Sequence, residues 1–477
     1  MKMLIGGKLV DASNKETIDV VNPATMQVVD TVPSATKEDI DLALDNAVKG
    51  FKEWSEYPIF ERINILRRFK QLYLEHGEEI AQLLCEDGGK TISLSRACVD
   101  WTSDLIDFYI EQSRTVCGET MPEGSYAGHD HDFVITTRQP LGVVVTIIPF
   151  NYPNDQISHK VIPALVMGNS VVVKPATDTP RANILYCQLL LEAGVPANAI
   201  QIVTGRGSVV GNLLVDDPRV AKVALTGSTQ AGIKVAKMCA EHMHHTCLEL
   251  GGNDPYIVLA DADPKKAAIE AADGRISNSG QTCCAPKRFI VHNSIKEQFI
   301  HELIEYIKTQ KVGDPLDESS VTGPLVSADA AKEVEEQINY TISQGAKLLH
   351  GGKRYNESYM EITVLDVTKD MDIMKDMEVF GPVFPVVGYD TVDEAIEIAN
   401  STMYGLSSGV YGNNVQDLLK ISKKLEAGTV MIGGHANYRT PDQPFGGWKM
   451  SGMGREGSTE TLKQMSQLKA TIFKKLY

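Results

Sequence analysis

Between residues 141 and 252 the chain repeats one pattern, a run of Val, Ile and Leu followed by a turn and a segment with helical spacing. Strands that are apolar at almost every position are buried on both faces, and strands that alternate with helices usually run parallel. The pattern therefore predicts a doubly wound parallel α/β sheet with helices on both sides. The apolar runs, in chain order, are "LGVVVTII" (141–148), "SVVVKP" (170–175), "AIQIVTG" (199–205), "AKVALTG" (221–227) and "TCLELGG" (246–252).

A second series of strands and helices follows residue 252 and predicts a second α/β domain. A chain of 477 residues is too long for one hydrophobic core, so two or three domains are expected. The turns are short and lack Ser/Pro linkers, which indicates domains packed against each other. The expected strands lie near "PYIVLA" (255–260), "RFIVH" (288–292), "FPVVGY" (384–389), "SSGVYG" (407–412) and "GTVMIG" (428–433), and the expected helices cover about 264–278, 295–310, 328–344 and 414–426.

The N-terminal part contributes early strands and an amphipathic helical stretch at about 37–115. Two further segments, "FVITTRQP" (133–140) and "SQLKATIFKKLY" (466–477), look like strands without a partner in their own domain. Exposed edge strands are normally covered or paired, so we expect these two to form a small β arm. The expected division is 1–120 with 141–250 for the first domain, 251–455 for the second domain, and 121–140 with 456–477 for the arm.

Composition excludes several classes of protein. A net charge of −16 disfavours binding to nucleic acid or to an anionic membrane surface. The chain contains no apolar run of 18 residues, so no membrane span is expected, and its start lacks the pattern of a signal peptide. The 8 cysteines form no CxxC pair, so they are expected to be reduced thiols of a cytoplasmic protein.

Polar residues and glycines stand at the ends of the strands of the first sheet, where open α/β sheets bind their ligands. Asn151 lies on the turn "PFNYP", Lys174 ends a run of valines, and Gly205 and Gly227 begin turns into the next helices. Small residues at such turns let backbone N–H groups approach a phosphate. Because the GxGxxG fingerprint is absent, these positions alone give only weak support for a phosphate-containing ligand.

Two other positions have the character of reactive groups. Glu249 ends a strand between two leucines, where desolvation would raise its pKa and suit it to act as a general base; the alternative is a strand-end carboxylate in an ion pair. The stretch "NSGQTCCAPKR" (278–288) places Cys283 and Cys284 after a Gly-Gln turn. Adjacent cysteines rarely bond to each other, so they are either small buried hydrophobic residues or include one nucleophilic thiol.

Seven motifs, in order and at matching spacing from about residue 140 to 457, together resemble the aldehyde dehydrogenase superfamily. They are Asn151, Lys174, "GSTQAG" (227–232), "LELGG" (248–252), "GQTC" (280–283), "EVFGP" (378–382) and "PFGGWKMSG" (444–452). The resemblance is to hydrolytic, non-acylating members, near the nonphosphorylating glyceraldehyde-3-phosphate, lactaldehyde or semialdehyde branches. It implies a Rossmann-like cofactor-binding domain, a catalytic domain and an oligomerisation arm that pairs across subunits, in a homodimer or homotetramer.

The resemblance also assigns the catalytic residues. It makes Cys283 the nucleophile that attacks the aldehyde carbonyl and later carries a thioester. The Asn151 amide and the Cys283 backbone N–H would donate to the oxyanion, and Glu249 would activate the water that hydrolyses the thioester. Cys284 is expected to be a packing residue, with a vicinal disulfide or a sulfenic adduct as the alternative.

For the cofactor, the resemblance places Lys174 at the adenine ribose, Ser228 at the pyrophosphate and Glu378 at the nicotinamide ribose. NAD-preferring members commonly have a Glu three residues after this lysine, where the present chain has Thr177. A carboxylate would repel a 2′-phosphate, whereas Thr177 beside Lys174 accepts one, so we expect NADP, with NAD as the alternative. The other expected cofactor contacts are Pro149, Phe150, Gly205, Gly227, Leu250 and Phe380.

The substrate is expected to be a small aldehyde. Succinate-specific members have arginines where this chain has His159 and Ser277, which argues against that assignment. Arg439 lies in the loop that lines the substrate tunnel in the family and would pair with a phosphate or carboxylate; the alternative is a solvent-exposed or subunit-contact arginine. Tyr152, His435 and Tyr438 are the other expected tunnel residues.

Three other functions are alternatives. A coenzyme-A-acylating dehydrogenase normally lacks the glutamate found at position 249, and a binding or structural protein on a silenced scaffold would usually lack one catalytic residue. A cysteine hydrolase would need a histidine partner for Cys283 that no motif supplies. The histidines of "EHMHHTC" (241–247) and "GHDHD" (128–132) lack a recognised ligand spacing, so no metal site is expected.

Overall fold

The computed structural model describes residues 1–475, and its first sheet is the doubly wound sheet that the apolar runs predict. Five strands run parallel in the order β8–β7–β6–β9–β10, and the antiparallel strands β2, β1 and β20 extend the two edges. The bounds are β1 Met3–Ile5, β2 Lys8–Val10, β6 Val143–Ile147, β7 Ser170–Lys174, β8 Ile200–Ile202, β9 Val220–Thr226, β10 His245–Glu249 and β20 Gly452–Met453.

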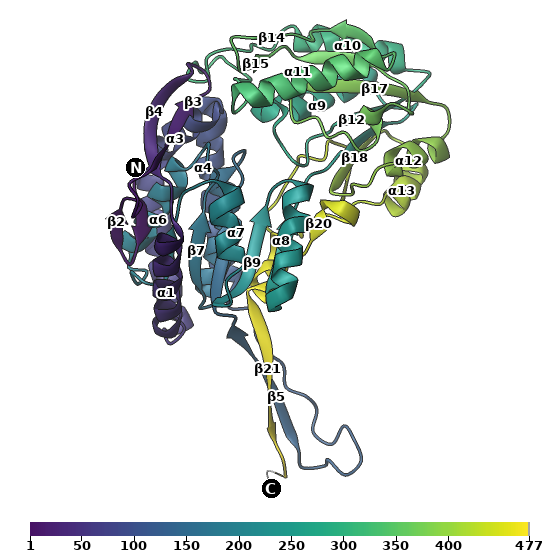
Figure 1. The fold of residues 1–477 in the computed structure, drawn as a ribbon. Helices are drawn as coiled ribbons and strands as arrows, with labels where there is room; N and C mark the ends of the chain where they lie inside the picture. The colour runs from purple at the N-terminus through teal and green to yellow at the C-terminus, as the bar shows by residue number, and fades with distance from the viewer. Residues whose placement is uncertain (476–477) are drawn as a thin grey trace.

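Helices cover both faces of this sheet because alternate residues of each strand point to opposite sides. Val144 of β6 packs into a core formed with α2 to α6, whereas Val143 and Val145 pack into a separate core formed with α1, α7 and α8. Figure 1 shows these helices around the purple and teal part of the chain. They span α1 Lys37–Trp54, α2 Ile59–Glu75, α3 Gly77–Gly88, α4 Ile92–Gln112, α5 Pro153–Val166, α6 Arg181–Ala193, α7 Asn212–Val215 and α8 Thr229–His242, with a short π-helical turn (Gly207–Gly211) before α7.

The second sheet lies in the green and yellow part of Figure 1. Its order is β13–β16–β17–β12–β11–β18–β19, and only the edge strand β13 is antiparallel to its neighbour. It too is buried on both faces, with α9 and α10 in one core and α11, α12 and α13 in the other. The strands are β11 Pro255–Val258, β12 Arg288–His292, β13 Lys347–His350, β16 Thr363–Asp366, β17 Val383–Tyr389, β18 Ser407–Tyr411 and β19 Thr429–Ile432, and the helices are α9 Pro264–Ile276, α10 Lys296–Ile307, α11 Ala328–Ser343, α12 Val392–Asn400 and α13 Val415–Lys424.

The two segments expected to form the arm lie side by side. Its strands, β5 (Phe133–Pro140) and β21 (Ser466–Phe473), pair antiparallel with each other along their full lengths, so each has a partner within the same chain. Figure 1 shows this hairpin projecting away from the rest of the molecule. The partner was not evident from the sequence because more than 300 residues separate the paired positions, for example Phe133 and Phe473.

The remaining elements are small. Two strand pairs lie outside the main sheets, and a short helix, α14 (Ser458–Gln464), leads from β20 into the arm. Within residues 1–475, no helix is both long enough and apolar enough to cross a membrane. The strand pairs are β3 Thr17–Asn22 with β4 Gln27–Pro33, and β14 Arg354–Tyr355 with β15 Tyr359–Met360.

Candidate active site

Two cavities meet at Cys283. One, of about 280 Å³, is lined by residues that include Tyr152, His159 and Arg439, and the other, of about 450 Å³, is lined by residues that include Ser228 and Glu378. Three residues line both cavities, namely Asn151, Thr226 and Cys283. Two of the residues expected at the reacting centre, Asn151 and Cys283, and many of those expected at the cofactor are therefore brought together from distant parts of the chain.

The turn that carries Cys283 has an unusual backbone. After α9, Asn278, Ser279 and Gly280 all have positive φ angles, of 51°, 57° and 77°. Gly280 is required there, since a Cβ atom would lie 2.3 Å from the Gly381 carbonyl oxygen. The Gln281 side chain ties the turn to the neighbouring loop, because its Oε1 accepts a hydrogen bond of 2.9 Å from the Val326 N–H. These contacts hold the turn in one conformation.

Asn151 is connected to the same turn. Its Nδ2 donates to the Gln281 carbonyl at 2.9 Å, and the Asn278 side chain donates to the Asn151 carbonyl at 3.1 Å. An amide nitrogen carries two hydrogens, so the contact with Gln281 orients the group and leaves its second hydrogen for another acceptor.

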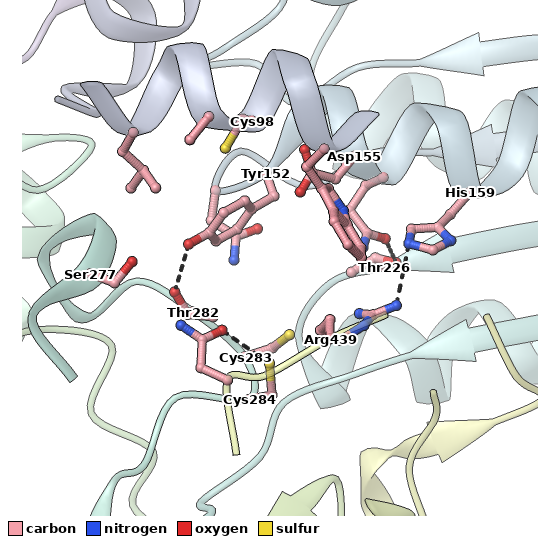
Figure 2. Close-up of a pocket in the computed structure, with 16 residues that line it drawn as sticks. Cys98, Tyr152, Asp155, His159, Thr226, Ser277, Thr282, Cys283, Cys284 and Arg439 are labelled. Carbon is pink, nitrogen blue, oxygen red and sulfur yellow. Dashed lines mark hydrogen bonds between the residues drawn. The ribbon is translucent and has the colours of Figure 1, made fainter. Parts of the chain in front are cut away.

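The two adjacent thiols have different surroundings. Cys284 is buried and donates to Asn437 Oδ1 at 3.6 Å, whereas Cys283 is partly exposed and lies on the walls of both cavities. The neighbouring Cys284 sulfur and burial raise the pKa of the Cys283 thiol, and the positive charges of Lys287 and Arg439 act against this by lowering it. Figure 2 shows both sulfur atoms below the smaller cavity.

Glu249 is almost fully buried, with an exposed fraction of 2%, and it does not line either cavity. Neither carboxylate oxygen has a hydrogen-bond partner in the described part of the chain. Oε1 lies in the space of the missing side chain of Gly446, where a Cβ atom would come within 2.8 Å. Burial and the negative charge of Glu456 raise the pKa of Glu249 well above its usual value.

A buried polar cluster next to Glu249 was missed in the sequence. Lys160 of α5 forms an ion pair with Glu456, and both residues are 2% exposed. Lys160 also donates to Gln156 Oε1 at 2.7 Å and to Thr226 Oγ1 at 2.8 Å. No local pattern in the sequence marks Glu456. Lys160 could have been found, because a lysine within a largely apolar helix indicates a buried charge that needs a partner.

The larger cavity is suited to a dinucleotide. Gly227 and Ser228 place the N-terminus of the 14-residue helix α8 in its wall, where phosphate groups are attracted. The carboxylate of Glu378 can accept hydrogen bonds from ribose hydroxyls, and Leu250 and Phe380 add apolar wall. Of the expected cofactor residues, the cavity is lined by Pro149, Phe150, Gly227, Ser228, Leu250, Glu378 and Phe380.

Lys174, Thr177 and Gly205 do not line that cavity but lie close to one another. Thr177 Oγ1 donates to the Gly205 carbonyl at 3.4 Å, and a Cβ atom on Gly207 would be 3.9 Å from Lys174 Nζ. Burial lowers the pKa of Lys174 to about 8, and the nearby carboxylate of Asp178 acts in the opposite direction.

The smaller cavity contains Arg439, which is fixed by its neighbours. One guanidinium nitrogen donates to His159 Nε2 at 3.2 Å, the group stacks 3.8 Å from the centre of the Phe445 ring, and its Nε has no partner in the described residues. Arg439 can only donate, so His159 accepts through Nε2 and carries its proton on Nδ1, which lies 2.8 Å from the Tyr109 hydroxyl. Burial and the charge of Arg439 lower the pKa of His159 to about 3, which keeps the ring neutral.

Two of the expected tunnel residues lie elsewhere. His435 does not line either cavity; its ring packs against Gly274 of α9, and its Nε2 is 3.7 Å from Glu270 Oε1. Tyr438 is 55% exposed and also lies outside the cavity walls. Neighbouring residues of an irregular loop can point in opposite directions, so the sequence of the loop did not indicate which of its side chains enters the cavity.

The opposite wall of the smaller cavity holds residues that the sequence did not indicate. Asp155 lies in the wall and accepts from Thr102 Oγ1 at 3.2 Å, and burial raises its pKa to about 6. Behind it, the ammonium of Lys90 lies 3.5 Å from the centre of the Tyr152 ring and 3.7 Å from Cys98 Sγ. Figure 2 shows Tyr152 and Asp155 across the cavity from Cys283 and Arg439.

Comparison with known proteins agrees with this geometry. The chain matches the aldehyde dehydrogenase family over residues 9–471. It is 36% identical to the lactaldehyde dehydrogenase of Escherichia coli, covering 95% of this chain and 94% of the relative, and 34% identical to the NADP(+) succinate-semialdehyde dehydrogenase of the same organism, covering 98% and 96%. The solved structure of betaine aldehyde dehydrogenase from Staphylococcus aureus in complex with NAD+ is 33% identical and superposes with a TM-score of 0.95 over 99% of this chain and 95% of that one.

A match over nearly the whole chain, with a cysteine at the junction of two cavities, has one consistent interpretation: the chain belongs to the aldehyde dehydrogenase family.

Proposed function

We propose that the protein oxidises a short, negatively charged aldehyde to the carboxylic acid, with Cys283 as the nucleophile. The observation that supports this most directly is the position of Cys283 in the walls of both cavities. An aldehyde in the smaller cavity and a hydride acceptor in the larger one would both reach this thiol, which aldehyde oxidation requires.

The thiolate of Cys283 attacks the carbonyl carbon, and the oxygen becomes an oxyanion. The free hydrogen of the Asn151 amide and the Cys283 backbone N–H donate to this oxygen. Ser228 and Glu378 would hold NAD(P)+ in the larger cavity, by its phosphates and by a ribose, and the bound cofactor would supply the hydride acceptor. After hydride leaves the former carbonyl carbon, a thioester joins the acyl group to Cys283.

Glu249 serves as the base in the second half of the reaction. Its carboxylate turns from the space beside Gly446 towards Cys283, takes a proton from water, and the hydroxide displaces the thiolate from the acyl carbon. Burial beside Glu456 raises the pKa of Glu249, so the carboxylate holds a transferred proton more readily than an exposed glutamate would. The ion pair of Lys160 and Glu456 lies next to Glu249 and offers a polar route for that proton.

The charge in the smaller cavity supports a substrate that carries a carboxylate or phosphate. Arg439 has an unpartnered Nε and is oriented by His159, so its free donors are available to an anionic group. A volume of about 280 Å³ lies near the lower end of the range of small-molecule sites and suits a small substrate. Asp155 on the opposite wall is placed to accept a hydrogen bond from a substrate hydroxyl, as a lactaldehyde-like or glyceraldehyde-3-phosphate-like substrate would offer.

For the cofactor we propose a preference for NADP, with NAD as the alternative. The support is the pair of Thr177 and Lys174, which offers a neutral hydroxyl and a cation where a carboxylate would repel a 2′-phosphate. The relatives include an NADP(+) enzyme and one solved with NAD+, so they do not favour either cofactor.

Absorbance at 340 nm tests the activity. The protein is incubated with NADP or NAD and with the charged succinate semialdehyde or glyceraldehyde-3-phosphate, or the uncharged lactaldehyde or propionaldehyde, with and without coenzyme A. We expect reduction with the charged aldehydes and a free acid as product. An acyl-coenzyme-A product would identify an acylating enzyme, and no reduction across the panel would favour a binding protein on a silenced scaffold.

We also propose that residues 1–120 with 141–250 bind the cofactor and residues 251–455 form the catalytic domain. Residues 121–140 with 456–477 would form the arm that joins subunits in a dimer or tetramer. The support for the last point is the projecting hairpin, whose Leu468 and Ile472 are 60% and 63% exposed.

A further inference from the structure

Lys287 is a buried cation directly behind the nucleophile. It follows Cys283 by four residues, and its side chain is only 1% exposed. The ammonium donates to the Thr282 carbonyl at 3.1 Å and to the Cys283 carbonyl. A buried ammonium needs such acceptors, since leaving it unpaired in a dry environment is costly.

The same ammonium contacts Glu378, which lines the larger cavity. Its Nζ lies 3.4 Å from Glu378 Oε1, and that oxygen also accepts from the Gly252 N–H at 3.1 Å. The carboxylate fits there because Gly251 has no side chain; a Cβ atom would come within 2.2 Å of Glu378 Oε2. Lys287 thus joins the turn of Cys283 to Glu378 and, through Gly252, to the end of the strand that carries Glu249.

The contact with the Thr282 carbonyl has a second consequence. That carbonyl belongs to the same peptide group as the Cys283 N–H. A cation on the oxygen polarises the peptide and makes its N–H a stronger hydrogen-bond donor. This N–H is the proposed backbone donor to the oxyanion, so Lys287 acts on it without touching the substrate.

Several charged groups surround the Cys283 thiol. Two are positive: Arg439 lies in the wall of the aldehyde cavity, where an anionic substrate would neutralise its charge, whereas Lys287 lines neither cavity and is held by the Thr282 and Cys283 carbonyls and by Glu378. The charge of Lys287 favours the thiolate and lowers the pKa of Cys283. The other titratable groups that act on this thiol, or on which it acts, are Cys284, Glu249 and Asp254.

We propose that Lys287 is a positioning residue that holds the nucleophile turn and Glu378 as one unit and keeps a permanent positive charge beside the Cys283 thiol. The part that concerns oxidation rests on the proposed function, whereas the effect on the thiol does not. The thiol is therefore measured without cofactor or aldehyde.

The rate of alkylation of Cys283 by iodoacetamide is followed against pH, with mass spectrometry of its peptide to separate it from the other cysteines. Removing the charge in Lys287→Met should raise the midpoint of the pH dependence of Cys283 alkylation by about one pH unit. Lys287→Arg keeps the charge, so its midpoint should lie close to that of the wild type. Glu378→Gln leaves the Lys287 ammonium without its counter-charge, so the midpoint of Cys283 alkylation should be lower in this variant than in the wild type.

Opposite shifts in Lys287→Met and Glu378→Gln would support the proposal, because a purely structural defect would not change sign between them. Equal midpoints in wild type and Lys287→Met, or shifts of both variants in the same direction, would overturn it. If Lys287→Met does not fold, Lys287→Gln, which removes the charge but keeps a hydrogen-bond donor, takes its place in this comparison. Shifts of the expected sign in a protein that oxidises no aldehyde would refute the proposed function and leave the placement of Lys287 standing.

Discussion

At the scale of single residues, Cys283 and Cys284 are neighbours in the chain with separate environments. Cys283 lies on both cavities, while Cys284 lies on the smaller one only and points its thiol to Asn437. Cys283→Ala should therefore abolish aldehyde oxidation and leave cofactor binding nearly unchanged, and Cys284→Ala should retain activity. Steady-state rates and cofactor titration by fluorescence check this. An active Cys283→Ala paired with an inactive Cys284→Ala would reverse the assignment.

Glu249 allows the two half-reactions to be separated. Glu249→Gln keeps the size of the side chain and removes its ability to take a proton, so thioester hydrolysis should slow more than hydride transfer. A burst of reduced cofactor equal to the enzyme concentration should survive in rapid mixing while turnover falls by about a hundredfold or more. Loss of the burst together with turnover would show instead that Glu249 activates Cys283.

The same residue predicts a pH dependence. Burial and Glu456 raise the pKa of Glu249, and a base must lose its proton before it can act. The rate of thioester hydrolysis should therefore rise with pH and reach its plateau above the range typical of an exposed glutamate. Single-turnover deacylation measured across pH gives the midpoint, and a profile that is already flat near pH 5 would contradict the raised pKa.

Thr177 is the position at which cofactor preference is tested. Thr177→Glu should accept hydrogen bonds from both ribose hydroxyls and repel a 2′-phosphate by about 1–3 kcal/mol, or roughly tenfold to a hundredfold. The ratio of kcat/KM for NADP and NAD should then move towards NAD, while the uncharged control Thr177→Gln should move it little. A wild-type protein that prefers NAD by tenfold or more would invalidate this interpretation of Thr177.

At the scale of elements, the anion site depends on helices that do not belong to the loop of Arg439. His159 of α5 accepts from Arg439, and Tyr109 of α4 orients His159. Tyr109 is itself held by the Gly457 N–H at 3.1 Å, just before α14. The loop supplies the positive charge, and α5, α4 and the turn before α14 together fix the orientation of the Arg439 guanidinium.

Arg439→Gln should raise KM for a negatively charged aldehyde by about tenfold to a hundredfold, because a charge-assisted hydrogen bond is lost. His159→Leu should give a smaller rise, since the guanidinium remains but loses its fixed orientation. Propionaldehyde should be little affected in both variants, and Tyr438→Phe, on the exposed side of the loop, serves as the control. Equal losses with charged and uncharged aldehydes would mean that Arg439 has a structural role only.

At the scale of the whole molecule, one chain contains both cavities and the reacting residues, and the arm is the only large feature of the described chain that extends away from them (Figure 1). Its two strands pair with each other, and residues 119–121 bond to the outer edge of β5, where the Thr136 N–H donates to the Glu119 carbonyl at 2.8 Å; the outer edge of β21 has no further strand partner in the described part of the chain and is free to pair. Light scattering at micromolar concentration should show a dimer or tetramer, and a proline at Thr136, in the middle of β5, should weaken the assembly. A monomeric wild-type protein would contradict the prediction that the arm joins subunits.

The sequence by itself determined the doubly wound sheet of the first domain, the α/β class of the second domain and most of the elements that form them. A strand buried on both faces must be apolar at successive positions, so the Val-rich runs at 143–147 and 170–174 were visible without any long-range information. It also indicated Asn151, Cys283 and part of the wall of the larger cavity, because each of these residues lies in a motif at the end of a strand or in a turn; the indicated wall residues are Pro149, Phe150, Gly227, Ser228, Leu250, Glu378 and Phe380.

Only the tertiary structure decided which side chains of these motifs meet and what surrounds them. Three contacts join residues more than 200 positions apart: the pairing of β5 with β21, the ion pair of Lys160 with Glu456, and the hydrogen bond from Arg439 to His159. No local periodicity encodes such contacts, since they depend on how the packed elements orient individual side chains. The same reason explains why His435 and Arg439, in one loop, face different parts of the molecule: one packs on Glu270 and the other reaches the cavity.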